Sequence, residues 1–332
     1  MGKVGMLLSI VTPFYNEEEV IDAFFSRLSA LLAEKLPDYD VEFVCVDDGS
    51  KDGTLALLTA RAAADPRVRV VELARNFGKE AALTAGLTVA RGDAVIPIDA
   101  DLQDPPEIIP EMVRLWTEEG YDVVEGRRAD RSSDTFLKRF SAESFYKLHN
   151  AISHQPIPEN TGDFRLMSRQ VVDVVNSLPE RQRFMKGIFA WVGFRRASIE
   201  FAREPRVAGS TKWNKWRLWN LALEGITSFS TWPLRVWTYI GATIAGLAFL
   251  YGLVLIISTL VGGRDVPGYA SLMSAILFMG GMQLVGIGIL GEYLGRTYLE
   301  SKQRPVFVIR AVHGQTVPGP ALRREESARV EA

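Results

Sequence analysis

Cysteine is nearly absent from this sequence, and histidine is scarce. Cys45 is the single cysteine among 332 residues, and the only histidines are His149, His154 and His313. One cysteine excludes an intramolecular disulfide framework and a cysteine-based zinc site. Three scattered histidines do not make a convincing zinc-binding pattern either. Any metal that this protein binds is therefore expected to have oxygen ligands.

The sequence also lacks an excess of positive charge. It has 38 Lys and Arg residues against 40 Asp and Glu, which gives a formal net charge of -2. Such a chain has no bulk attraction to nucleic acid, so we expect no nucleic-acid partner. Hydrophobic residues make up 47% and charged residues 23%, a balance that is typical of globular proteins and excludes disorder over the whole chain.

Two common nucleotide-binding patterns are missing. No Walker A loop is present, which excludes a P-loop ATPase. Gly286, Gly288 and Gly291 have the spacing of a dinucleotide-binding fingerprint. Because they lie inside a long apolar run and not at a strand-to-helix turn, we reject that function.

Two long uncharged runs dominate the C-terminal third of the sequence. They cover residues 236–261 and 269–291, and each exceeds the roughly 20 residues that cross a bilayer as a helix. The short linker between them predicts a transmembrane hairpin, although two buried helices of a soluble domain pass the same test. Lys and Arg residues flank the outer ends of the pair, so the positive-inside rule predicts that both chain ends are cytoplasmic. We expect no signal peptide at the N-terminus, because residues 1–8 are too short for one and polar sequence follows at once.

These runs divide the chain into four parts. We expect a cytoplasmic domain over residues 1–211, membrane-interface helices over 212–235, two transmembrane helices within 236–295, and a partly disordered cytoplasmic tail over 296–332. The interface assignment depends on a helical spacing of tryptophans with interleaved lysine and arginine, although a core helix is the alternative. The expected location is the inner (plasma) membrane, as a multi-pass protein.

Short apolar runs alternate with helical patterns in the first part of the chain. Strands are predicted over residues 7–13, 41–46, 68–73 and 94–99, and helices over 18–36, 54–64 and 79–91. This alternation predicts an α/β fold, a mostly parallel, Rossmann-like sheet covered by helices. Ligands of such sheets bind at the carboxyl ends of the strands.

An acidic motif follows the fourth predicted strand. Asp99, Asp101 and Gln103 alternate along the sequence and supply two carboxylates and an amide. Such oxygen donors suit Mg²⁺ or Mn²⁺. A solvated turn is the alternative, but the buried strand before the motif and the two prolines after it favour a metal site.

Further polar segments follow the first two strands and the strand near residue 125. Asp47 and Asp48 exceed what capping of the next helix requires, so one of them is a candidate ligand of a nucleobase or ribose. Tyr15 is placed to stack on a base. Three clusters of cations are also present, at Arg127–Arg128, Lys138–Arg139 and Arg206–Lys212. Such clusters are often solvated surface, but in a chain without net positive charge they favour a polyphosphate-binding site.

The order of these motifs resembles one enzyme family. The segments TPFYNEEE, VDDGSKDGT, RNFGKEAALTAG, DADLQDPPE, EGRR, TGDFRLMSR and RVAGSTKWN, followed by two spans, resemble the family 2 glycosyltransferases with the GT-A fold. Within that family they are similar to polyprenyl-phosphate glycosyltransferases, which include dolichyl-phosphate mannose synthases and bacterial bactoprenol glucosyltransferases. The resemblance covers roughly residues 7–300.

The resemblance implies a role for each matching residue. The implied nucleotide-sugar contacts are Pro13, Tyr15, Glu17, Val46, Asp48, Asp99, Ala100, Arg206 and Lys212, and the implied ligands of the divalent cation are Asp99, Asp101 and Gln103. Asp101, Asp163 and Arg127 are the implied catalytic residues. The implied acceptor-phosphate contacts are Arg127, Arg128, Arg139 and Ser141, of which the last two do not align cleanly with the family pattern.

The resemblance also implies a reaction. It is inverting transfer of a hexose from a UDP-sugar, with UDP-glucose favoured, to polyprenyl phosphate, for use in cell-envelope glycosylation. N-acetylglucosamine, galactose, mannose and aminoarabinose donors stay open, because one sequence does not show which hydroxyl groups a pocket accepts. A membrane-anchored UDP-binding scaffold is the non-enzymatic alternative. A homotetramer is implied by the resemblance alone.

Overall fold

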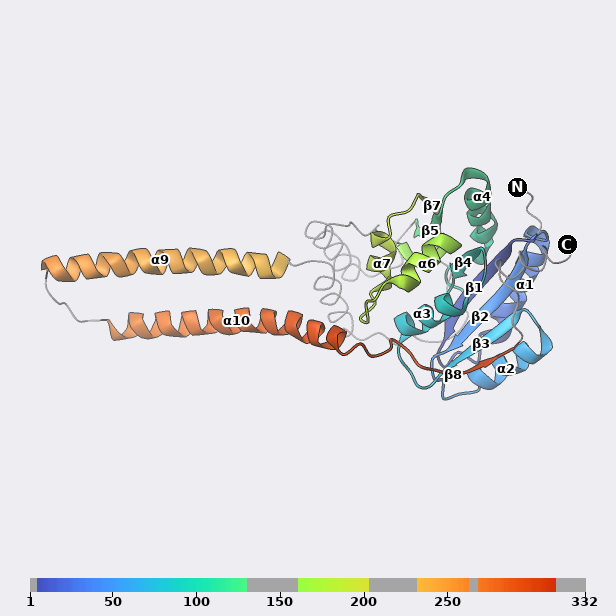
Figure 1. Ribbon diagram of the computed structural model, residues 1–332, viewed down its shortest axis with the longest axis horizontal. Coiled ribbons are helices and arrows are strands. Elements are labelled where there is room, and N and C mark those ends of the chain that lie inside the picture. The colour runs from blue at the N-terminus through green and yellow to red at the C-terminus, as the bar shows by residue number, and fades with distance from the viewer. Residues whose placement is uncertain (1–4, 130–160, 203–231, 263–267, 315–332) are drawn as a thin grey trace, which may run out of the picture.

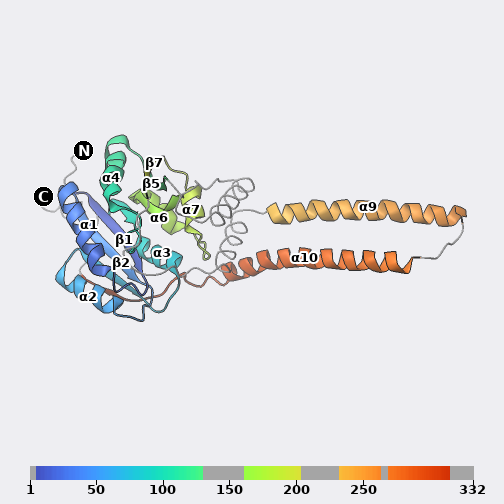
Figure 2. The same cartoon turned by 180° about the vertical axis from the view of Figure 1, so that it is seen from behind.

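The computed structural model describes residues 5–129, 161–202, 232–262 and 268–314. These residues form a globular α/β part and two long helices that project from it (Figures 1 and 2). The strands are β1 (Leu7–Phe14), β2 (Asp40–Asp47), β3 (Val68–Leu73), β4 (Ala94–Pro97), β5 (Val123–Arg128), β6 (Thr161–Ser168), β7 (Arg196–Phe201) and β8 (Ile309–His313). The helices are α1 (Ile21–Lys35), α2 (Thr54–Ala64), α3 (Lys79–Val89), the 3-10 turn η1 (Pro106–Ile108), α4 (Ile109–Glu119), α6 (Arg169–Ser177), α7 (Met185–Trp191), α9 (Trp232–Gly262) and α10 (Tyr269–Ser301).

The strands form one sheet in the order β7-β5-β6-β4-β1-β2-β3-β8. The central strands β4, β1, β2 and β3 are parallel, whereas β6 is antiparallel to both β4 and β5. The prediction of a mostly parallel sheet covered by helices is therefore confirmed. Because β6 runs against its neighbours, its first residues lie at the same edge as the carboxyl ends of β4 and β5.

Both faces of the sheet are packed. Phe14, Phe24 and Phe43 are fully buried where α1 packs on the sheet. The rings of Phe14 and Phe24 contact each other edge to face. On the opposite face, α3 lies directly on β1 and β2. Gly86 makes this close approach possible, because a Cβ atom there would overlap the side chain of Val11 and lie 3.1 Å from Cγ2 of Val46. This contact fixes α3 and, with it, the first residues of that helix.

We expect Gly86→Ala to destabilise the protein by about 1–3 kcal/mol, because the added methyl group overpacks the contact between α3 and the sheet. Thermal unfolding of the purified full-length protein in detergent measures the loss. Gly241→Ala on α9 is the matched control, since a Cβ atom there meets nothing within 4 Å. Equal melting temperatures for the two variants would contradict this packing account.

The two C-terminal helices have the length and composition of membrane spans. Candidate spans cover Leu234–Val254 in α9 and Ser271–Ser301 in α10, and they expose large apolar side chains such as Phe249, Leu250 and Leu284. A Cβ atom at Gly286 would overlap the ring of Trp237, so this glycine admits the indole between the helices. Two long apolar helices joined by a short linker agree with the predicted hairpin. The predicted interface segment 212–235 lies mostly outside the described residues.

The segment after α10 returns to the sheet, and this strand was not predicted from the sequence. β8 pairs antiparallel with β3 at the edge of the sheet (Figure 1). Glu72 on β3 contacts Arg310 at 3.3 Å and His313 at 3.2 Å. Within the predicted tail, residues 296–301 thus complete α10, and β8 is part of the globular fold and ties the chain after the hairpin to the edge of the sheet.

Candidate active site

The loops after β1 and β2 are joined by hydrogen bonds. The backbone N–H of Asn16 donates to Oγ of Ser50 at 3.0 Å, and Oδ1 of Asn16 accepts from the N–H of Lys51 at 2.8 Å. Asn16 has a φ of 52°, a left-handed conformation that asparagine tolerates. The joined loops place Tyr15 and Glu17, both half-buried, beside the carboxyl end of β2.

Asp48 connects the end of β2 to the start of α3. Its two carboxylate oxygens accept the backbone N–H groups of Phe77 at 2.7 Å and Gly78 at 2.9 Å. Burial raises the pKa of Asp48 above its ordinary value, while the two N–H bonds oppose that rise. Asp48 therefore orders the turn from which α3 begins, in addition to any contact that it makes with a ligand.

The acidic loop after β4 has an unusual backbone. Leu102, between Asp101 and Gln103, has a φ of 52°, and its side chain is buried in the core. A left-handed leucine costs roughly 1–2 kcal/mol, which burial of the side chain offsets. Oδ1 of Asp101 accepts the N–H of Gln103 at 3.2 Å. The polar side chains on either side of Leu102 are thus held in a tight turn at the sheet edge.

Lys79 joins two of the predicted site residues. Its Nζ lies 2.7 Å from Oδ1 of Asp99 and 2.7 Å from Oδ2 of Asp163, which is on β6. The structure therefore brings the loop after β4 and the start of β6 together around one ammonium group. Lys79 is not among the site residues predicted from the sequence. A signal was present, because Lys79 is the first residue of α3 and a cation is electrostatically disfavoured at a helix N-terminus.

The charges around Lys79 shift the pKa values of its neighbours. Burial acts to raise the pKa of Asp163, but Lys79 and Lys186 outweigh it and lower that pKa to about 2. Burial and the nearby Asp163 raise the pKa of Glu80 to about 8. Asp163 is consequently ionised at neutral pH, and its negative charge is compensated by lysine.

The predicted cation ligands fit a hard divalent ion by their chemistry. Asp99, Asp101 and Gln103 present oxygen atoms within one turn, and the side chain of Asp99 is 32% exposed. Oδ1 of Asp163, close by, is buried without a hydrogen-bond partner among the described residues, so a polar ligand at this place would satisfy it. No cluster of three or more His, Cys, Asp or Glu side chains that could hold a metal ion occurs in the described parts.

The arginines at the end of β5 lie at the same edge of the sheet. Arg128 is 3.5 Å from Asp104 of the acidic loop, and Arg127, whose side chain is 47% exposed, is 4.0 Å from Glu200. Between β5 and β6, Arg165 forms a buried ion pair with Glu125 at 3.2 Å and donates to the carbonyl of Gly162 at 2.7 Å. These contacts fix the start of β6 beside Asp163.

The remaining predicted residues divide into two groups. Val46 and Ala100 are buried, so a contact with a nucleotide would use their backbone, while Pro13 is half-buried near the carboxyl end of β1. Arg139, Ser141, Arg206 and Lys212 lie outside the described residues, as does most of the tryptophan-rich segment.

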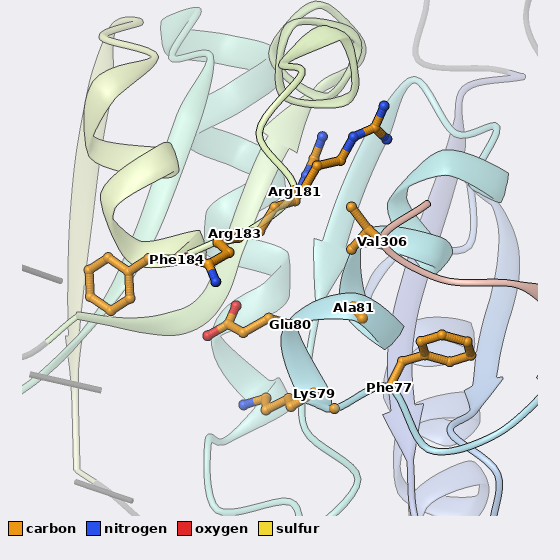
Figure 3. Close-up of a pocket in the computed structure, with 10 residues that line it drawn as sticks. Phe77, Lys79, Glu80, Ala81, Arg181, Arg183, Phe184 and Val306 are labelled. Carbon is orange, nitrogen blue, oxygen red and sulfur yellow. The ribbon is translucent and has the colours of Figure 1, made fainter. Parts of the chain in front are cut away.

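A cavity of about 230 Å³ lies beside Lys79 (Figure 3). Its walls come from the N-terminal turn of α3, from the segment between α6 and α7, and from Val306 after α10. Lys79 and Glu80 line one side and Arg181 and Arg183 the other (Figure 3). The cavity thus connects the group around Lys79 with the part of the globular domain that meets the membrane hairpin.

Comparison with known proteins identifies the family. Residues 9–175 match Glycosyl transferase family 2, and residues 232–297 match the GtrB C-terminal hairpin. The chain is 54% identical to the prophage bactoprenol glucosyl transferase homolog of Escherichia coli K12, over 92% of this chain and 99% of the relative. It is 56% identical to the bactoprenol glucosyl transferase of Shigella phage SfV, over 92% of this chain and 98% of the relative. An uncharacterized glycosyltransferase of Bacillus subtilis is 40% identical over 92% of this chain and 94% of its own length. The chain belongs to glycosyl transferase family 2, is a glycosyltransferase, and joins its catalytic domain to a membrane-associated hairpin of the GtrB type.

Proposed function

We propose that this enzyme transfers glucose from UDP-glucose to a polyprenyl phosphate at the cytoplasmic face of the membrane. The product is a lipid-phosphate sugar that serves as a donor for cell-envelope glycosylation. The observation that carries the proposal is the joining of an acidic site at the sheet edge, around Asp99, Asp163 and Lys79, to an apolar hairpin in one chain. The names of the two relatives with 54–56% identity support the sugar and the lipid class.

The donor is assigned to the carboxyl edge of the sheet. The nucleoside is assigned to the carboxyl ends of β1 and β2 and the loops after them, through Pro13, Tyr15, Glu17 and Asp48. Arg206 and Lys212 are assigned to the diphosphate. A divalent cation, Mg²⁺ or Mn²⁺, held by Asp99, Asp101 and Gln103, supplies charge stabilisation to the departing nucleoside diphosphate when bound. These oxygen donors follow β4 directly, so the rigid sheet sets their position.

The acceptor needs orientation more than it needs a base. A phosphate monoester has a second pKa of about 6, so its attacking oxygen is already largely ionised near neutral pH. Asp163, with its pKa lowered to about 2, is a poor proton acceptor but a fixed negative group that holds Lys79 in place. Arg127 and Arg128, together with Arg139 and Ser141, are assigned to the acceptor phosphate. Direct attack on an α-linked donor gives a β-linked product.

The membrane arrangement follows from the charges that flank the spans. The short linker between α9 and α10 offers one Arg beside one Asp, whereas several Lys and Arg residues follow α10. Both chain ends and the catalytic domain are therefore assigned to the cytoplasm. Residues 212–235 are assigned to the membrane interface between the domain of residues 1–211 and the spans. A homotetramer is proposed on the family resemblance only.

The test uses detergent-purified full-length protein, Mg²⁺ or Mn²⁺, polyprenyl phosphate and a panel of radiolabelled sugar nucleotides. Label that moves into organic solvent measures transfer to lipid. We expect transfer from UDP-glucose alone among UDP-glucose, UDP-N-acetylglucosamine, UDP-galactose, GDP-mannose and UDP-aminoarabinose. Transfer from a different donor would contradict the assignment of glucose. Binding of UDP without any transfer would favour the non-enzymatic alternative, a membrane-anchored UDP-binding scaffold.

A further inference from the structure

The last turn of α10 contacts the segment between α6 and α7. The carboxylate of Glu300 accepts the backbone N–H of Arg181 at 3.0 Å on each oxygen, and Oε1 also accepts the N–H of Gln182 at 2.9 Å. Hydrogen bonds to an ionised acceptor are about twice as strong as neutral ones. A single carboxylate on the membrane hairpin therefore holds two consecutive residues of the catalytic domain.

A second side chain of α10 contacts the same dipeptide. Arg296, one helical turn before Glu300, donates to Oε1 of Gln182 at 3.0 Å and is also paired with Glu292 at 2.9 Å. Residues four apart lie on one face of a helix, so Arg296 and Glu300 form a two-point contact. After α10 the chain supplies Val306 to the cavity wall and packs Phe307 on the core.

The segment held by Glu300 leads directly to the candidate active site. Arg181 and Arg183 line the same cavity as Lys79 (Figure 3). Two residues further on, α7 begins, and its Lys186 is one of the two lysines whose charge acts on Asp163. Glu300 therefore joins the end of the membrane helix to one wall of the cavity that holds Lys79.

We propose that Glu300 is a positioning residue, which fixes the segment between α6 and α7 to the end of the membrane helix and so sets the site at a defined height above the bilayer. This inference rests on the proposed function, because a fixed height matters only when the acceptor is held in the membrane. A misplacement of about 1 Å is enough to slow transfer by about 10²-fold.

The test compares two acceptors in the full-length protein reconstituted in liposomes. One is a long polyprenyl phosphate embedded in the bilayer, and the other is a short, water-soluble prenyl phosphate. For Glu300→Ala we expect kcat/KM for the long acceptor to fall by about tenfold, which is less than the roughly 10²-fold cost of a full 1 Å misplacement because Arg296 still holds Gln182. The values for the short acceptor and the KM for the sugar nucleotide should stay unchanged, and Glu300→Gln should fall between Glu300→Ala and the wild type. Glu292→Gln is the matched control, because within the described parts of the chain the Glu292 carboxylate pairs with Arg296 on its own helix, whereas the N–H groups of Arg181 and Gln182 donate to Glu300.

Hydrogen exchange gives a readout that does not depend on activity. The amides of Arg181 and Gln182 should exchange slowly in the wild type and in Glu292→Gln, and faster in Glu300→Ala. Unchanged exchange would overturn the contact itself. Equal losses for both acceptors, with a lower melting temperature, would show a merely structural role. Wild-type protein that labels neither acceptor would instead contradict the proposed function, and the positioning role with it.

Discussion

Replacing Asp101 by alanine is expected to lower kcat/KM for sugar transfer by about 10²–10³-fold, because the departing diphosphate loses charge stabilisation that is pre-arranged at the sheet edge. We expect Asp99→Ala to have a similar effect. Asp163→Asn should cost only about tenfold, well below the 10²–10⁴-fold that a general base contributes. Steady-state transfer of labelled glucose to polyprenyl phosphate measures all three variants. A loss for Asp163→Asn that equals or exceeds the loss for Asp101→Ala would establish base catalysis by Asp163.

The pH profile separates the same two mechanisms. Because Lys79 and Lys186 lower the pKa of Asp163 to about 2, Asp163 does not titrate in the range where the enzyme works. The acidic limb of kcat/KM should therefore reflect the acceptor phosphate, near pH 6, and should persist unchanged in Asp163→Asn. Disappearance of that limb in Asp163→Asn would assign it to Asp163. The lowered pKa of Asp163 also stabilises the folded protein: this contribution to the free energy of unfolding is present above about pH 4 and is lost as the pH falls toward 2.

Replacing Lys79 by methionine is expected to have the second large effect, about 10²-fold on kcat. The ammonium group lies 2.7 Å from a carboxylate oxygen of Asp99 and 2.7 Å from one of Asp163. Without it, two carboxylates of the site lose their shared counter-charge, and burial then favours protonation of Asp163. Lys79→Arg should retain part of the activity because it keeps the charge. The same transfer assay measures both variants.

A matched control for Lys79→Met is Lys35→Met at the end of α1, where the lysine pairs with its sequence neighbour Glu34 at 2.8 Å. That variant should transfer sugar at the wild-type rate. A folded Lys79→Met protein with wild-type kcat would show that the ammonium group has no part in the reaction, and it would leave Asp99 and Asp163 as independent groups.

The strength of the local sequence patterns explains which parts of the fold could be predicted. The strand before Asp99 is a short apolar run that ends at acidic residues, so its place at the carboxyl edge follows from pattern alone. β8 could not be predicted in this way, because it is stabilised by pairing with β3 far back in the sequence. A short alternating segment after a membrane span has no local signal for such a long-range partner.

The site shows the same division. Asp99, Asp101 and Asp163 could be named because they belong to recognisable segments of the chain. Lys79 had a local signal, a cation at a helix N-terminus, but its role in the site could not be predicted, because that role depends on the tertiary contact between the loop after β4 and the antiparallel strand β6. Likewise the left-handed backbone of Leu102 could not be predicted, because it accompanies burial of the side chain in the core, which is a tertiary contact.

The most direct test of the account is the chemical identity of the lipid product. Purified full-length enzyme is incubated with UDP-glucose and polyprenyl phosphate, and the lipid product is examined by mass spectrometry and by the anomeric coupling in proton NMR. The account predicts a polyprenyl phosphate that carries one β-linked glucosyl residue on its phosphate. An α-linked product, or free glucose with no glycosylated lipid, would contradict it.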